Sequence, residues 1–178
     1  MTPYKQALCD AMAMLAKDPA TIFIGYGLRK DRAGGTIPPV PDSMLIDPPV
    51  AENLMAGLAI GLSLAGRRPL VYFERFDFAL NAADAIVNHL DKAKQISRGE
   101  FDPGVIFRCV VGNIDKPIYT GITHTQNHSE AFRAMLVFPV IELITPESVT
   151  TEYQSAYDWG SEGMTSRSSM LVEFKGML

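Results

Sequence analysis

The sequence predicts an α/β fold in which a doubly wound, mostly parallel sheet is flanked by helices. Short β-rich or apolar runs alternate along the chain with longer segments of helical periodicity, a pattern that indicates crossover units and a parallel sheet covered on both faces. The chain has 178 residues, 47% of them hydrophobic and 20% charged, which suits about one globular domain. We therefore expect residues 1–178 to form a single domain.

In the first half of the chain, glycines and prolines mark the ends of the expected helices and strands most clearly. Apolar residues recur at helical spacing over 4–17 and predict a helix, and the β-rich run 21–25 predicts a strand that the next glycines end. Glycines and prolines predict an irregular loop over 28–43, whose length is typical of a functional loop. A short strand is expected at 44–46. Asp47 and the two prolines after it predict the start of a helix over about 50–65, which ends at Gly66.

The second half continues the alternation. Strands are expected at 70–73, 105–111, 140–144 and 170–174, and helices at 79–94, 129–135 and 148–159, with a long loop over 113–128. An aromatic turn separates the strand at 70–73 from the next helix. Because this turn and both long loops follow strands, we expect them at the edge formed by the carboxyl ends of the strands, where open α/β sheets bind ligands.

Charge and composition exclude several functions. The net charge is −4 and no cluster of Lys and Arg occurs, which argues against a nucleic-acid partner. No apolar run is long enough to span a bilayer, so no membrane partner is expected. The two cysteines, Cys9 and Cys109, lie far apart, which favours a reducing compartment and a cytoplasmic protein.

An ordered set of segments resembles one family. The stretch from Ile46 to Gly61, IDPPVAENLMAGLAIG, resembles the start of the cofactor-activating region in transketolases, deoxyxylulose phosphate synthases and 2-oxo-acid dehydrogenase beta subunits. The similarity continues, in order, through residues 66–69, 76–78, 83–88, 124–126, 130–132 and 171–174, and so covers nearly the whole chain. The chain thus looks like the pyrimidine-binding domain of a thiamine-diphosphate-dependent enzyme, with the thiamine-diphosphate-binding fold.

The resemblance assigns roles to four residues. Glu52 matches the carboxylate that bonds the cofactor's aminopyrimidine ring and activates it, and Phe78 matches the aromatic residue that stacks on this ring. His124 matches a histidine that moves substrate protons, and Gln126 would lie beside it against the cofactor or substrate. Each has a simpler alternative: a glutamate favouring a helix dipole, a core aromatic residue, and solvated loop residues.

A metal site is not expected in this chain. His128 follows His124 by four residues, but the pair falls in a loop and lacks an evident third ligand. The family holds the cofactor's diphosphate through a divalent cation in a second domain, usually marked by Gly-Asp-Gly. That motif does not occur here. The resemblance therefore implies a partner subunit that binds the diphosphate and Mg²⁺, with the cofactor at the interface of a homo- or hetero-oligomer.

The reaction implied is transfer of a two-carbon ketol or acyl unit, or decarboxylation of a 2-oxo acid. The small-molecule substrate would be a ketose or a 2-oxo acid. Dehydrogenase beta subunits usually carry an acidic residue where this chain has Tyr26, and this departure favours transketolase-like carboligation or simple decarboxylation. Two alternatives remain: a non-catalytic scaffold or regulatory subunit that retains the fold, and a stand-alone small-molecule binder.

Overall fold

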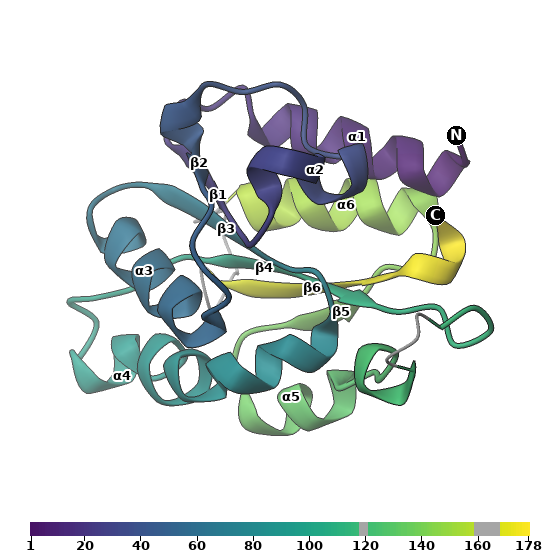
Figure 1. The fold of residues 1–178 in the computed structure, drawn as a ribbon. Coiled ribbons are helices and arrows are strands. Elements are labelled where there is room, and N and C mark those ends of the chain that lie inside the picture. Colours follow the sequence, from purple (N-terminus) through teal and green to yellow (C-terminus); the bar gives the residue numbers. More distant parts are fainter. Residues whose placement is uncertain (118–120, 159–167) are drawn as a thin grey trace.

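A computed structural model describes residues 1–117, 121–158 and 168–178. Its centre is a six-stranded sheet in the order β2-β1-β3-β4-β6-β5, with parallel pairing throughout (Figure 1). The strands are β1 (Thr21–Ile24), β2 (Leu45–Ile46), β3 (Arg68–Phe73), β4 (Ile106–Val111), β5 (Val140–Glu142) and β6 (Ser169–Phe174). The predicted fold class is confirmed.

Helices cover both faces of the sheet (Figure 1). One face carries α1 (Pro3–Leu15), α2 (Leu28–Gly35) and α6 (Pro146–Tyr157), and the other carries α3 (Glu52–Leu64), α4 (Ala93–Ile96) and α5 (Ser129–Met135). Strand side chains alternate between the two cores: Phe23 joins the cluster under α1 and α6, whereas Ile22 and Ile24 join the cluster under α3. Because both faces are buried, most strand residues are apolar, whichever face they point to.

Two helices begin at side-chain caps that the sequence contains. The Thr2 hydroxyl accepts a hydrogen bond from the Lys5 amide at 3.1 Å, and Pro3 occupies the first helical position of α1. Thr145 and Ser148 cap α6 reciprocally, each side chain accepting from the other's backbone amide. These contacts satisfy amide groups that the helix itself leaves unpaired.

The segment predicted as one helix over 79–94 is different. It consists of a 3₁₀ helix (Phe76–Ala82), a π-helix (Ala85–Leu90) and the short α4. Phe76, Ala79, Ala82 and Ala85 are all buried and recur at every third position. Residues three apart align on one line of a 3₁₀ helix, so this spacing fits the tighter winding better than an α-helix.

The loop expected over 28–43 is also partly helical. It contains α2 and a 3₁₀ turn (Asp42–Met44). Asp47, expected to begin the helix at 50–65, instead accepts hydrogen bonds from the amides of Gly27 and Arg29 at 2.8 and 2.9 Å and so stabilises the start of α2. The helix that follows Asp47 in the sequence, α3, begins at Glu52 without a side-chain cap.

The other loop regions frame the end of the sheet. Within 113–128, Gly121–His124 forms a 3₁₀ turn, while 118–120 fall outside the described residues, as does Trp159, the expected end of the last helix. Another 3₁₀ turn, Lys175–Met177, follows β6. In the described part of the chain, no helix combines the length and apolarity needed to cross a membrane.

The chain reverses its winding between two neighbouring strands. After β1 it passes to α2 on one face, whereas after β3 it passes to the 3₁₀ helix at Phe76–Ala82 and to α4 on the opposite face (Figure 1). Such a switch point opens a crevice outside the carboxyl ends of the two strands, and α/β sheets bind ligands there. The fold therefore places a candidate site between the ends of β1 and β3.

Candidate functional site

A cavity of about 230 Å³ lies at this switch point. Its walls come from the segment after β1, the start of α3 and the residues just before it, the end of β3 and the aromatic turn that follows β3. The lining residues are Tyr26, Val50, Glu52, Met55, Tyr72, Phe73, Glu74 and Phe78. The cavity is thus a largely apolar slot that carries two carboxylates and no cationic side chain.

Glu52 supplies the buried carboxylate of this cavity. It stands in the first turn of α3 and is 7% exposed. The side-chain amide of Asn81 donates a long hydrogen bond, 3.4 Å, to its Oε2. Burying a carboxylate in apolar surroundings is unfavourable unless it is hydrogen-bonded. A ligand that brings a hydrogen-bond donor into the slot would therefore be stabilised by Glu52.

Phe78 joins this cavity to its neighbour. Its ring meets the ring of His124 edge to face, with the centroids 5.1 Å apart and the planes at 90°. His124 ends the 3₁₀ turn Gly121–His124, and its Nδ1 lies 3.1 Å from the Thr123 hydroxyl. The structure therefore places three of the predicted residues, Glu52, Phe78 and His124, in one continuous region.

A second cavity, of about 200 Å³, lies on the His124 side. It is formed at the ends of β3, β4 and β6 by Arg75, Gly112, Asn113, Lys116, His124, Thr125 and Lys175. Burial, and then the charge of Arg75, lower the pKa of Lys175. Cations crowded in this way favour a bound anion, because an anion relieves their mutual repulsion. We call this the cationic cavity.

Gln126 contacts the aromatic turn. It lines neither cavity, and its Nε2 donates a hydrogen bond to Oδ1 of Asp77 at 2.7 Å. His128 approaches the same carboxylate, with Nε2 3.9 Å from Oδ1. Among the described residues, no group of three or more His, Cys, Asp or Glu side chains could hold a metal ion.

Sequence reasoning missed several residues of this region. Tyr26 was noted only as a departure from the family, and Glu74, Arg75 and Lys175 were not singled out. A usable signal is their position, because all four stand within two residues of the end of a strand, and the carboxyl ends of these strands share one edge of the sheet. Nothing local marks Asp77 as buried, because its burial depends on the loop at 121–128 folding over it.

Comparison with known proteins identifies relatives of one kind. No protein-family model matches the sequence. The chain is 29% identical over 150 residues to the pyruvate dehydrogenase E1 component subunit beta of Rickettsia conorii, which covers 81% of this chain and 44% of that protein. Its similarity to the mitochondrial counterpart from Saccharomyces cerevisiae is 28% over 150 residues, covering 81% of this chain and 39% of the yeast protein. The chain spans less than half the length of these relatives.

A solved structure shares the fold. A chain described as split gene transketolase, inactive beta4 tetramer, superposes with a TM-score of 0.71 at 15% identity, over 96% of this chain and half of that one. Together, these comparisons confirm the resemblance inferred from the sequence. This chain is similar in sequence to the beta subunits of pyruvate dehydrogenase E1 and shares the fold of a chain described as a split gene transketolase.

Proposed function

We propose that this chain is the cofactor-activating subunit of a split thiamine-diphosphate-dependent enzyme, with residues 1–178 acting as one pyrimidine-binding domain. The observation that carries the proposal is the placement of Glu52 and Phe78 in the same cavity at the switch point of the sheet. The two residues are far apart in the sequence, and the fold brings them together. The homology to E1 beta subunits supports the same function.

The cavity suits the aminopyrimidine ring of the cofactor. The ring is flat, apolar on its faces and polar at its nitrogen atoms. Val50, Met55, Phe73 and Phe78 supply apolar and aromatic surface, and the buried Glu52 carboxylate supplies a polar group that can bond a ring nitrogen. An offset aromatic contact contributes about 0.5–1.5 kcal/mol beyond area burial.

The residues of the chain have distinct tasks in this function. Thiamine diphosphate, when bound, supplies a carbon nucleophile and an electron sink for two-carbon chemistry. Glu52 holds a proton at the pyrimidine nitrogen, which activates the cofactor, and Phe78 orients the ring. His124 faces the substrate side, where an imidazole can orient a substrate oxygen or move its proton near neutral pH.

A partner subunit is needed for the rest of the cofactor. The lining of the Glu52 cavity carries two acids, Glu52 and Glu74, and would repel a diphosphate. We therefore assign the diphosphate and its Mg²⁺ to a second chain, in a homo- or hetero-oligomer with the cofactor at the interface. The solved relative of this fold is itself described as the product of a split gene and as a tetramer, which supports this arrangement.

The cationic cavity points to an anionic substrate. Arg75, Lys116 and Lys175 line it beside His124, whose ring contacts Phe78 of the Glu52 cavity. A carboxylate or a phosphate there would be held by charge-assisted hydrogen bonds. The substrate class is therefore a 2-oxo acid or a phosphorylated ketose, which undergoes decarboxylation or donates a two-carbon ketol or acyl unit.

The test uses the chain purified from its own host with thiamine diphosphate and magnesium present. Native mass spectrometry should find a complex with a second chain and the added mass of the cofactor, and this complex should turn over 2-oxo acids or phosphorylated ketoses. Glu52→Gln should keep the complex assembled and lower kcat by about 100-fold or more, because a positioned proton-transfer group contributes about 10²–10⁴-fold. Glu130→Gln, at an exposed carboxylate, is the matched control.

Each alternative predicts a different outcome. A scaffold or regulatory subunit would assemble with its partner, and Glu52→Gln would retain full activity. A stand-alone binder would take up the cofactor as a single chain without a partner. A chain that stays both alone and cofactor-free would refute the split-enzyme proposal.

A further inference from the structure

Asp77 is a buried acid that lines neither candidate cavity. It lies between Phe76 and Phe78 in the aromatic turn, and its side chain is only 6% exposed. Its Oδ1 accepts the 2.7 Å hydrogen bond from Gln126 and lies 3.9 Å from Nε2 of His128. Within the described residues, Oδ2 of Asp77 and Nε2 of His128 are buried without a hydrogen-bond partner. Burying a polar atom without a hydrogen bond costs free energy. The burial of apolar area therefore does not explain why Asp77 stands at this position.

Both partners of Asp77 come from the loop that carries His124. Gln126 and His128 follow His124 by two and four residues, and His128 directly precedes α5. The ring of His128 also packs edge to face on Phe76, with the centroids 5.7 Å apart. The aromatic turn therefore holds this loop by a polar contact through Asp77 and by an apolar contact through Phe76.

The loop has a second support at the end of β4. A Cβ atom added to Gly112 would lie 2.0 Å from the backbone oxygen of His124 and 3.2 Å from Cγ2 of Thr125. No side chain fits at that distance, so the backbone of His124 rests directly on the glycine. Gly112 thus permits the close approach of the loop at His124, and Asp77 holds the loop at Gln126 and His128.

We propose that Asp77 is a positioning residue that holds the loop 121–128 so that His124 faces Phe78 between the two cavities. Its importance for turnover rests on the proposed function, but its effect on the loop does not. Asp77 acts through Gln126 and His128 rather than by touching a ligand. Without it, the edge-to-face contact of Phe78 and His124 loses its polar support.

Histidine NMR tests this directly, because the chain has only three histidines, His89, His124 and His128. In the full chain, with any copurifying partner bound, the ring signal of His124 should carry a ring-current shift that Phe78→Leu removes. Asp77→Ala should remove most of that shift. Asp77→Asn should restore it, because its carbonyl oxygen still accepts from Gln126.

Two further variants make the result specific. Gln126→Ala, at an exposed residue, should reproduce the effect of Asp77→Ala, and the double variant should add little to either. Asp84→Ala is the matched control, because Asp84 is an exposed acid that bonds Asn88 and lies 3.4 Å from His89. It should move only the His89 signal.

The outcomes separate this inference from the proposed function. If the His124 signal is unchanged in both Asp77→Ala and Gln126→Ala, Asp77 does not position the loop. If the signal moves and kcat of the complex falls by roughly 10- to 100-fold, as a small misplacement of a reacting group predicts, both stand. If the signal moves while kcat is unchanged, the positioning stands and the proposed role of His124 is wrong.

Discussion

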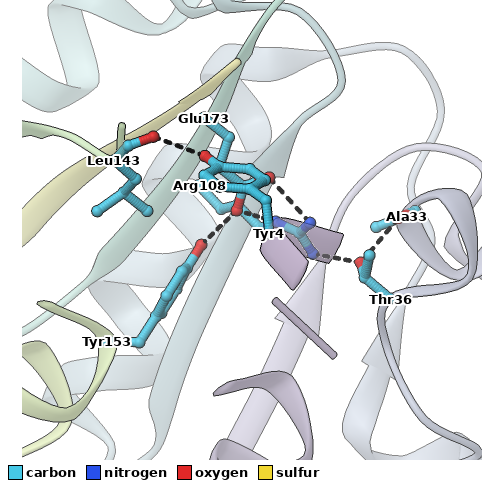
Figure 2. A network of polar contacts seen from close by, with 7 residues as sticks. All are labelled: Tyr4, Ala33, Thr36, Arg108, Leu143, Tyr153 and Glu173. Atoms are coloured by element: carbon cyan, nitrogen blue, oxygen red, sulfur yellow. Dashed lines mark hydrogen bonds and ion pairs between the residues drawn. The ribbon is translucent and has the colours of Figure 1, made fainter. Parts of the chain in front are cut away.

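Replacing Glu173 by glutamine tests how the core holds the buried guanidinium of Arg108. Arg108 on β4 and Glu173 on β6 are 1% and 0% exposed and pair through two hydrogen bonds, Nε to Oε1 at 2.7 Å and Nη2 to Oε2 at 3.0 Å (Figure 2). Tyr153 donates to the same carboxylate at 2.8 Å, and Nη1 of Arg108 donates to Thr36. Both charges are therefore compensated inside the protein.

The expected cost follows from this geometry. Glutamine keeps one acceptor oxygen but places an NH₂ group against Nη2, so a donor meets a donor, and Arg108 keeps a buried charge without a counter-ion. Removing one partner of a buried ion pair costs about 3–5 kcal/mol. That is a large share of the ~5–15 kcal/mol by which a domain is stable. We expect Glu173→Gln to lower the free energy of unfolding by about 4 kcal/mol.

Urea unfolding followed by circular dichroism measures this value, with the slope m as a check on two-state behaviour. Glu130→Gln is the matched control, because Glu130 pairs with Arg133 at the surface and such pairs contribute below about 1 kcal/mol. The joint replacement Arg108→Met with Glu173→Leu should cost far less than the two single changes added together, since it removes both charges. A loss below about 1 kcal/mol for Glu173→Gln, at unchanged m, would refute the reasoning.

Three further predictions concern the cationic cavity, the buried Tyr72 and the start of α2. Lys175→Met should raise KM for an anionic substrate about 10- to 100-fold with little change in kcat, because it removes a charged hydrogen-bond donor. An equal rise in KM from Lys94→Met, outside the cavity, would contradict this. Burial raises the pKa of Tyr72 from 10.0 to about 12, so its contribution to stability is full below pH 10 and is lost as the pH rises through about 12; an unfolding free energy that is flat over this window would exclude it. Asp47→Ala should cost about 1 kcal/mol and speed amide exchange in the first turn of α2, whereas Asp42→Ala, which breaks an exposed ion pair, should do neither.

Local pattern was sufficient for most of the fold. Apolar spacing and breaking residues located each strand of the described chain within a few residues and placed α1, α3, α5 and α6, whereas α2 falls in a segment expected to be a loop. It was incomplete at 79–94, where one helix was expected and the structure has a 3₁₀ helix, a π-helix and the short α4. It also failed at Asp47, whose hydrogen-bond partners lie 18 and 20 residues earlier in the chain. Capping by a distant side chain leaves no local signal.

The candidate site was likewise predictable only in part from the sequence. Glu52, Phe78 and His124 were singled out from the order of motifs, and the structure places them in one region. The contact of Gln126 with a ligand stays a prediction, and its hydrogen bond to Asp77 could not be foreseen from the sequence. The segment 105–111 was expected to be a buried strand, and it is, although Arg108 stands in its middle. A guanidinium is tolerated there because Glu173 from another strand neutralises it.

By itself, the sequence determined the alternation of strands and helices, the parallel sheet and the resemblance to transketolases and 2-oxo-acid dehydrogenase beta subunits. These follow from periodicity, breaking residues and motif order, which act over short stretches of chain. Only the tertiary structure decided which polar groups are buried together: the Glu52 cavity, the cationic cavity, the Asp77 contacts and the Arg108–Glu173 pair. Burial is what makes these charges consequential, because low-dielectric surroundings strengthen each interaction and penalise each missing partner, and burial is a property of the whole fold.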